Sequence, residues 1–218
     1  MFARFLSTGL ALLCFAGTVG AQDHAAGKAP AKTSDVYSRP VDALTGEPLG
    51  DKPVIVQHEG RELRFATQAN ADAFKADAAG NLKKLDALMV AEQTPNYPLK
   101  TCVVSGEELG SMGKPVDVIH NNRLVRLCCA GCKGALTKDP KAAFEKLNAA
   151  VVSAQKPTYA AKQCVVMAHD GLTEGSTDYV VANRLVRFCC DGCVEEFEKQ
   201  PAKYLAKLDV AGNGAAKK

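Results

Sequence analysis

The sequence has no tryptophan, and only 6% of its 218 residues are aromatic. Large aromatic side chains supply much of the apolar area that a core buries, so we expect a core that is small or divided among small units. The composition is otherwise that of a globular chain, with 47% hydrophobic and 23% charged residues. It is neither a disordered nor a collagen-like composition.

Two further absences concern function. No segment concentrates Lys and Arg, and the formal net charge is only +3, so nucleic acid is not a predicted partner. The chain also has no glycine-rich phosphate loop, no His-Glu-x-x-His helix and no nucleophile–base–acid set. The sequence gives no positive reason to expect an enzyme, and we predict that the protein is not one.

The longest apolar run is at the N-terminus, where it is too short for a comfortable transmembrane span. Arg4 precedes the run "FLSTGLALLCFAGTV", and "VGA" ends at Ala21 as a small-residue cleavage site. This pattern predicts a signal peptide over residues 1–21 and a periplasmic or secreted protein. Leu13 stands before Cys14, where a lipoprotein signal would have a small residue, so soluble export is favoured over a lipid anchor.

The remaining chain contains one unit three times, with a period of about 60 residues. "NRLVRLCCAGCKGALTKDP" matches "NRLVRFCCDGCVEEFEKQP" further on, and "YSRPVDALTGEPLGDKPVIVQHEGRELRF" is an earlier copy without cysteines. We name these repeat 1 (residues 36–90), repeat 2 (94–148) and repeat 3 (156–210). A flexible linker is predicted over residues 22–35 and a tail over 211–218, with "AEQT" and "NAAVVSAQK" separating the repeats.

Each repeat predicts an α+β unit of a knuckle loop, a β-hairpin and two short helices. Two β-type runs flank Asn121-Asn122 in repeat 2 and Ala182-Asn183 in repeat 3, which indicates a two-residue hairpin turn. A helical pattern follows and stops before Pro140 or Pro201, and each proline suits the first position of a second helix. Units of this size bury little apolar area and usually need an additional link, such as a disulfide or a structural metal ion.

The predicted mature chain has eight cysteines, four in each of repeats 2 and 3. One cysteine precedes the expected hairpin and three follow it as Cys-Cys-x2-Cys. A hairpin returns the chain on itself, so these thiols are expected to converge on one point, as in a thiolate metal site. The cysteines are Cys102, Cys128, Cys129 and Cys132 in repeat 2, and Cys164, Cys189, Cys190 and Cys193 in repeat 3.

The adjacent pair in each repeat limits how many thiols reach one ion. Neighbouring side chains on a regular strand point to opposite faces, so both can bind only where the strand has ended. Cys129 and Cys190 are therefore candidate fourth ligands, and the other three cysteines of each repeat are the principal ones. Cys132 and Cys193 fall in the first helical turn, where free N–H groups favour a thiolate. Four thiolates suit Zn²⁺ and three or fewer suit Cu⁺, so we predict about one such ion per cysteine-containing repeat.

These residues carry a resemblance. The stretch from "CVVSGEELG" to "RLCCAGCKGALTKDPKAAFEKL" resembles a YHS-type or TRASH-like heavy-metal-binding domain, and the likeness extends to all three copies. It implies a small zinc-knuckle-like α+β unit that binds or traffics soft metals. Metal buffering, delivery or detoxification would follow, with a membrane or secreted protein as recipient. Repeat 1 departs from the pattern at every cysteine, so metal binding is not carried over to it.

Two alternatives remain. Export to an oxidising compartment favours a disulfide-stapled interaction protein, although a vicinal pair bonds only with strain. The spacing from Cys129 to Cys132 would also suit a thiol–disulfide carrier, but the strand order does not suggest a thioredoxin-like sheet.

Several other residues have simpler roles. Phe65, Leu127 and Phe188 are predicted core residues, and His58, His120, Met167 and His169 are taken as structural or loop residues. Arg61, Arg123 and Arg184 follow the hairpin turns and are predicted on solvated faces. Asp42 and Asn70 stand in repeat 1 where Cys102 and Cys132 stand in repeat 2, and they offer too few oxygen ligands for a hard cation.

Overall fold

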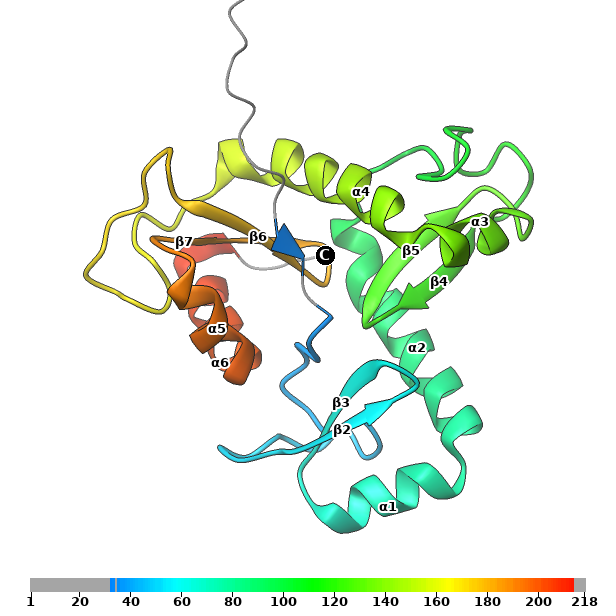
Figure 1. Ribbon diagram of the computed structural model, residues 1–218, viewed down its shortest axis with the longest axis horizontal. Coiled ribbons are helices and arrows are strands. Elements are labelled where there is room, and N and C mark those ends of the chain that lie inside the picture. The colour runs from blue at the N-terminus through cyan, green and yellow to red at the C-terminus, as the bar shows by residue number, and fades with distance from the viewer. Residues whose placement is uncertain (1–31, 34, 214–218) are drawn as a thin grey trace, which may run out of the picture.

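The computed structural model describes residues 32–33 and 35–213 of the chain. The predicted signal peptide lies outside them, as do most of the predicted linker and residues 214–218 of the tail. The described residues form an α+β fold with three hairpin–helix repeats, as the sequence predicts (Figure 1).

Repeat 1 begins with a knuckle loop, closed by a bridge between Val41 and Pro48, and continues as a hairpin and two helices. Its elements are β2 (Val54–His58), β3 (Arg61–Phe65), α1 (Gln68–Ala76) and α2 (Ala78–Gln93). The two strands pair antiparallel, with Val54 opposite Phe65. A 3₁₀ turn, η1 (Thr94–Asn96), leads into repeat 2.

Repeat 2 has the same order of elements. They are β4 (Val116–His120), β5 (Arg123–Leu127), α3 (Cys132–Lys138) and α4 (Pro140–Gln155), followed by η2 (Lys156–Thr158).

Repeat 3 contains β6 (Thr177–Val181), β7 (Arg184–Phe188), α5 (Gly192–Lys199) and α6 (Pro201–Leu208). Residues Asp209–Asn213 (η3) continue past α6, and β1 (Lys32–Thr33) adds to β6 as a parallel strand.

The local signals for turns and helix starts are confirmed. Asn121 and Asn122 have φ angles of 46° and 66°, the left-handed values that a tight hairpin turn needs. Ala182 and Asn183 have φ angles of 45° and 58° in the equivalent turn. Both second helices begin at the expected proline, whose fixed φ suits that position.

The predicted separators between repeats differ from the structure. "AEQT" and "NAAVVSAQK" are largely helical, because they form the last turns of α2 and α4. Val151 in this part of α4 is fully buried, so the helix continues where it still has an apolar face to cover.

Each repeat has its own hydrophobic core, as the scarcity of aromatic residues predicts. Phe65, Leu127 and Phe188, at the end of the second strand of each hairpin, are all fully buried, which confirms them as core residues. Phe65 packs edge-on against Phe74 of α1, with ring centroids 5.3 Å apart, and Phe188 meets Phe197 of α5 at the same distance.

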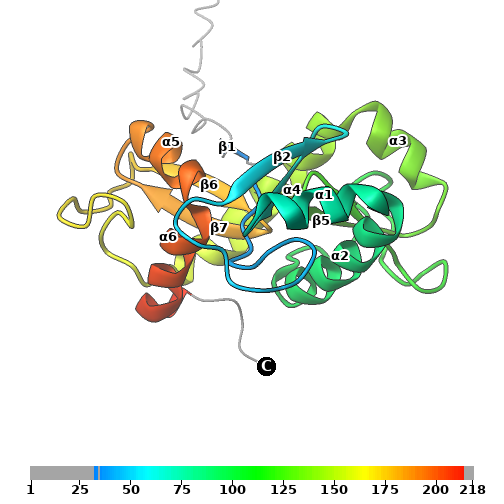
Figure 2. The same cartoon turned by 90° about the horizontal axis from the view of Figure 1, so that it is seen from below.

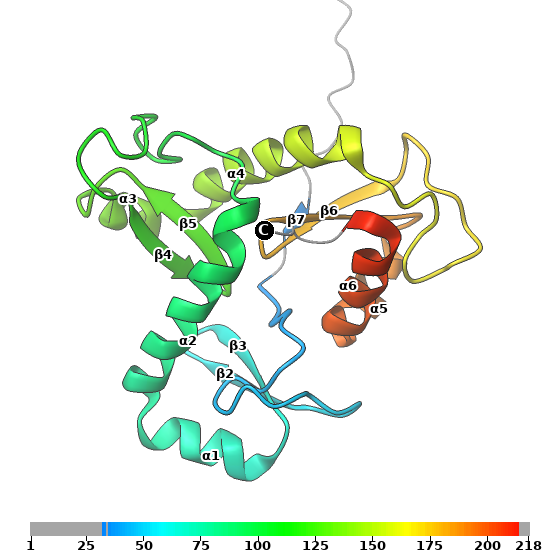
Figure 3. The same cartoon turned by 180° about the vertical axis from the view of Figure 1, so that it is seen from behind.

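The long helices join one repeat to the next. Helix α2 packs on the β4–β5 hairpin, and α4 packs on the β6–β7 hairpin (Figures 1 and 3). Gln93, the last residue of α2, donates its amide to the carbonyl of Asn122 at 2.9 Å and accepts the N–H of Leu124 at 2.8 Å. Gln155, the last residue of α4, makes the same pair of bonds with Asn183 and Leu185.

The arginines after the hairpin turns also contribute to the junctions, which are the contacts between one repeat and the turn of the next. The prediction that these arginines lie on solvated faces is wrong for two of them. Arg61 and Arg123 are only 8% and 1% exposed. Arg61 Nε donates to Asn122 Oδ1 at 2.6 Å, and Arg123 Nε donates to Asn183 Oδ1 at 2.7 Å. Each arginine therefore binds the turn of the following repeat.

Candidate metal centres

The first candidate centre forms at one end of the repeat 2 hairpin. Cys102 lies in the knuckle loop, Cys128 directly follows β5, and Cys132 is the first residue of α3. The knuckle closes through a bridge between Thr101 and Glu108, and the Cys102 N–H donates to the Glu107 carbonyl at 2.7 Å. The three sulfurs all lie within 4.8 Å of one another.

The second centre repeats this plan. Cys164 in the knuckle, Cys189 after β7 and Cys193 in the first turn of α5 also have their sulfurs within 4.8 Å of one another. The knuckle is one residue longer here, because the Cys164 N–H donates to the carbonyl of Asp170. The structure thus brings together the three principal cysteines that the sequence predicts in each repeat.

The spacing of the sulfurs suits a metal ion. Four sulfurs around one Zn²⁺, each at about 2.3 Å, would be about 3.8 Å apart. Cys128 Sγ and Cys132 Sγ are 3.7 Å apart, and Cys189 Sγ and Cys193 Sγ are 3.6 Å apart. A disulfide needs about 2.05 Å, and the eight cysteines are free thiols in this structure.

The vicinal cysteines lie outside both groups of three. Cys129 and Cys190 both lie after the end of the second strand of their hairpin. The strand alternation therefore does not force them away from the neighbouring cysteine. Cys190 is exposed, and its sulfur is 3.6 Å from Cys193 Sγ and 4.0 Å from Cys189 Sγ. Cys129 is half-buried.

The knuckle cysteines have lowered pKa values. Burial alone would raise the pKa of Cys102, but hydrogen bonds from Ser105 and from the backbone N–H groups of Cys128 and Val104 outweigh it and lower the pKa to about 6. The pKa of Cys164 is lowered in the same way, against burial, by the N–H groups of Met167, Cys189 and Val166.

The helix-start cysteines behave in the opposite way from the sequence expectation. Burial, together with the neighbouring thiols, raises the pKa of Cys132 to about 12, and the pKa of Cys193 is also raised. The N–H groups at the helix start lower the pKa of the preceding vicinal cysteine instead. Gly131 and Cys132 do this for Cys129, and Cys193 does it for Cys190. An expectation based on the helix dipole alone could not identify which sulfur those groups contact.

Repeat 1 fills the same position with hydrogen-bonded side chains in place of thiols. The Asp42 carboxylate is fully buried and accepts the N–H groups of Leu44 at 2.7 Å and Thr45 at 3.0 Å through Oδ1. Its Oδ2 accepts the N–H of Ala66 at 2.7 Å and the side-chain amide of Asn70 at 2.8 Å. These three backbone N–H groups are the equivalents of those that contact Cys102 in repeat 2. Both oxygens of the carboxylate therefore accept N–H donors, three of them from the positions that contact the thiol in repeat 2.

No protein-family model matches this chain, and no curated protein or solved structure matches it either. None of the helices within residues 35–213 has both the length and the apolar character needed to cross a membrane. Because the comparisons identify no relative, the function is inferred from the geometry of the centres.

His58, His120 and His169 belong to neither group of three cysteines. His169 is 74% exposed in its side chain and lies 3.5 Å from Asp170, its neighbour. His58 and His120 end equivalent strands and meet Phe74 and Phe144, which agrees with a shared structural role.

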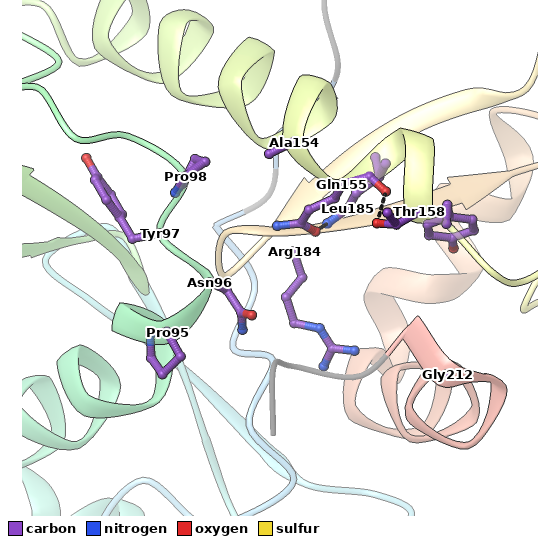
Figure 4. Close-up of a pocket in the computed structure, with 11 residues that line it drawn as sticks. Pro95, Asn96, Tyr97, Pro98, Ala154, Gln155, Thr158, Arg184, Leu185 and Gly212 are labelled. Atoms are coloured by element: carbon purple, nitrogen blue, oxygen red, sulfur yellow. Dashed lines mark hydrogen bonds between the residues drawn. The ribbon is translucent and has the colours of Figure 1, made fainter. Parts of the chain in front are cut away.

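A cavity of about 350 Å³ lies between repeats 2 and 3, away from the cysteines. Figure 4 shows the Arg184 side chain between Asn96 and Gly212, with Tyr97 and Gln155 on the surrounding elements. Its lining contains no sulfur, so it offers nothing to a soft metal ion.

Helices α3 and α5, which carry the last cysteine of each centre, lie at opposite ends of the molecule (Figures 1 and 2). The two centres are therefore separate, and one ion cannot bridge them.

Proposed function

We propose that this protein binds thiophilic metal ions, Zn²⁺ or Cu⁺, with one ion in each of its two cysteine centres. The role would be metal buffering, delivery or detoxification outside the cytoplasm. The observation that carries the proposal is the convergence of three cysteine sulfurs within 4.8 Å, twice, from the same three points of the fold.

Repeat 1 supports this interpretation. Where the thiols are absent, Asp42 and Asn70 join the knuckle to the start of the first helix by hydrogen bonds. A repeat of this size needs a connection at that point, since its core is small. In repeats 2 and 3 a metal ion bound by thiolates would supply the connection.

The order of knuckle, hairpin and helix also supports a family assignment. We propose that repeats 2 and 3 are YHS-type or TRASH-like modules and that repeat 1 is a cysteine-free copy. The proposal gives the protein a binding role without catalysis. Its partner would be a membrane or secreted protein that receives the metal.

The experiment is a joint measurement of bound metal and free thiols on protein purified from its export compartment without chelators. Two ions per chain, with thiols that react only after the metal is removed, are expected. No metal and no free thiols would establish the disulfide-stapled alternative. Free thiols without metal, in a protein that reduces or oxidises a thiol substrate, would favour a redox carrier.

The same purification tests export. Signal cleavage after Ala21 predicts a mature N-terminus at Gln22, which mass spectrometry of the intact chain measures directly. An uncleaved chain recovered from the cytoplasm would contradict this part of the proposal.

A further inference from the structure

The two centres share three cysteines but differ in what surrounds them. In repeat 2, the hydroxyl of Ser105 lies 3.3 Å from Cys128 Sγ, and Cys128 is buried. In repeat 3, Met167 takes the position of Ser105, and its N–H lies 3.5 Å from Cys164 Sγ. The Asp170 carboxylate lies 3.7 Å from Cys189 Sγ, so each centre has an oxygen neighbour. Repeat 3 differs in carrying a methionine in its knuckle where repeat 2 has a serine.

The sulfur-bearing residues beside the two centres also differ in exposure. Met167 is 40% exposed, and Cys190 is exposed, whereas its equivalent Cys129 is half-buried. Cys189 is half-buried where its equivalent Cys128 is 1% exposed, but Cys193 is 4% exposed where its equivalent Cys132 is half-buried. Each group of three thus has two buried thiols and one half-buried thiol. Repeat 3 therefore differs from repeat 2 in the exposed sulfur-bearing residues beside its centre, Cys190 and Met167, and not in the burial of the three principal thiols.

Exposed sulfur favours exchange of a soft ion. Thiolate and thioether ligands select Cu⁺, and an ion moves between proteins most readily when an incoming sulfur can bind before all the outgoing bonds break. Cys190 Sγ lies 3.6 Å from Cys193 Sγ, close enough to take over the ion as a bond to the enclosed thiols is lost. Each metal–sulfur bond that breaks on the protein is replaced by one to the recipient, and the oxidation state of the ion does not change.

We propose, on the basis of the metal-binding function above, that the two centres have different roles. The repeat 3 centre exchanges Cu⁺ with a sulfur-bearing recipient through Cys190 and Met167, and the repeat 2 centre retains its ion.

The test follows transfer of Cu⁺ from the full chain, loaded anaerobically with two equivalents, to an excess of a chromogenic Cu⁺ chelator. Two phases of one ion each are expected, with rates that differ by at least about tenfold, or about 1.4 kcal/mol in barrier. Cys164→Ser should remove the fast phase, and Cys102→Ser should remove the slow one.

Matched variants test the exposed sulfurs themselves. Cys190→Ser and Met167→Ser should slow the fast phase, while Cys129→Ser should leave both phases unchanged. Ser105→Met should accelerate the slow phase, because it places a thioether beside the repeat 2 centre.

The outcomes separate this inference from the function on which it rests. Two bound ions that leave at one rate, or a fast phase that Cys102→Ser removes, would overturn the division of roles and leave metal binding intact. A chain that binds no ion would overturn the proposed function itself.

Discussion

The side-chain amide of Asn70 donates a 2.8 Å hydrogen bond to the buried carboxylate of Asp42. These two residues occupy the places that Cys102 and Cys132 occupy in repeat 2, where the two sulfurs belong to one candidate metal centre. One repeat therefore closes the gap between knuckle and helix by hydrogen bonds, while the others present thiols there. The comparison indicates that the thiols of repeats 2 and 3 act as a set.

Asp42→Ala should destabilise the protein by about 3 kcal/mol, because it leaves four N–H donors without their acceptor in a buried site. The loss should be the same with and without added metal. Urea unfolding measures it, and Asp51→Asn, at an exposed position, is the control. A cost no larger than that of the control would show that the Asp42 carboxylate does not hold repeat 1 together.

Cys132→Ser should reduce the bound metal from two ions per chain to one, since it removes one of three converging thiols. Cys193→Ser should do the same through the other centre. Cys129→Ser should retain two ions, because Cys129 lies outside the group of three. Elemental analysis of each purified variant provides the count, and an equal loss from Cys129→Ser would make that residue a required ligand.

The metal-free protein should lose stability as the pH falls from 9 toward 6. The pKa of Cys102 is about 6 in the folded protein and about 9 for an ordinary cysteine, so folding favours its thiolate. This contribution is fully present above pH 9 and is lost as the pH falls through 6. The raised pKa of Cys132, about 12, acts above pH 9 and does not oppose the trend in this range.

Urea unfolding at a series of pH values, with chelator present, measures this dependence. Cys102→Ser isolates the contribution of Cys102. In this variant the free energy of unfolding should depend less on pH, and the remaining dependence should include any part due to Cys164. Identical slopes for the two proteins would contradict the prediction.

Gln93→Ala should cost about 1–3 kcal/mol, because the carbonyl of Asn122 and the N–H of Leu124 would lose their partner in a buried junction. Gln155→Ala should cost less, since its bonds lie in a partly buried site. Gln57→Ala, on an exposed strand position, is the control. Equal costs for all three substitutions would mean that the junctions do not contribute to stability.

Much of each repeat could be predicted because its signals are local. The Asn121-Asn122 turn needs residues that accept positive φ, and Pro140 fixes a helix start. Convergence of the cysteines follows from the hairpin, which returns Cys128 to the knuckle that holds Cys102.

The junctions could not be predicted in this way. Arg123 is charged and follows a turn, which normally indicates an exposed position, but its partner Asn183 is 60 residues further along the chain. A local pattern gives no information on how repeats pack, so the burial of this arginine is visible only in three dimensions. The donors around Asp42 were missed for a similar reason, since three of the four are backbone groups with no sequence signature.

The junction at Gln93 also has a consequence for the order of folding. Repeat 1 closes through the hydrogen bonds of Asp42 and is synthesised before the other two repeats. Folding during synthesis generally starts with the N-terminal units. The end of α2 then presents Gln93 in place for the Asn122 turn, so the next hairpin can form against a surface that already exists. We expect repeat 1 to nucleate folding of the chain, with metal uptake as a later step on a hairpin that is already docked.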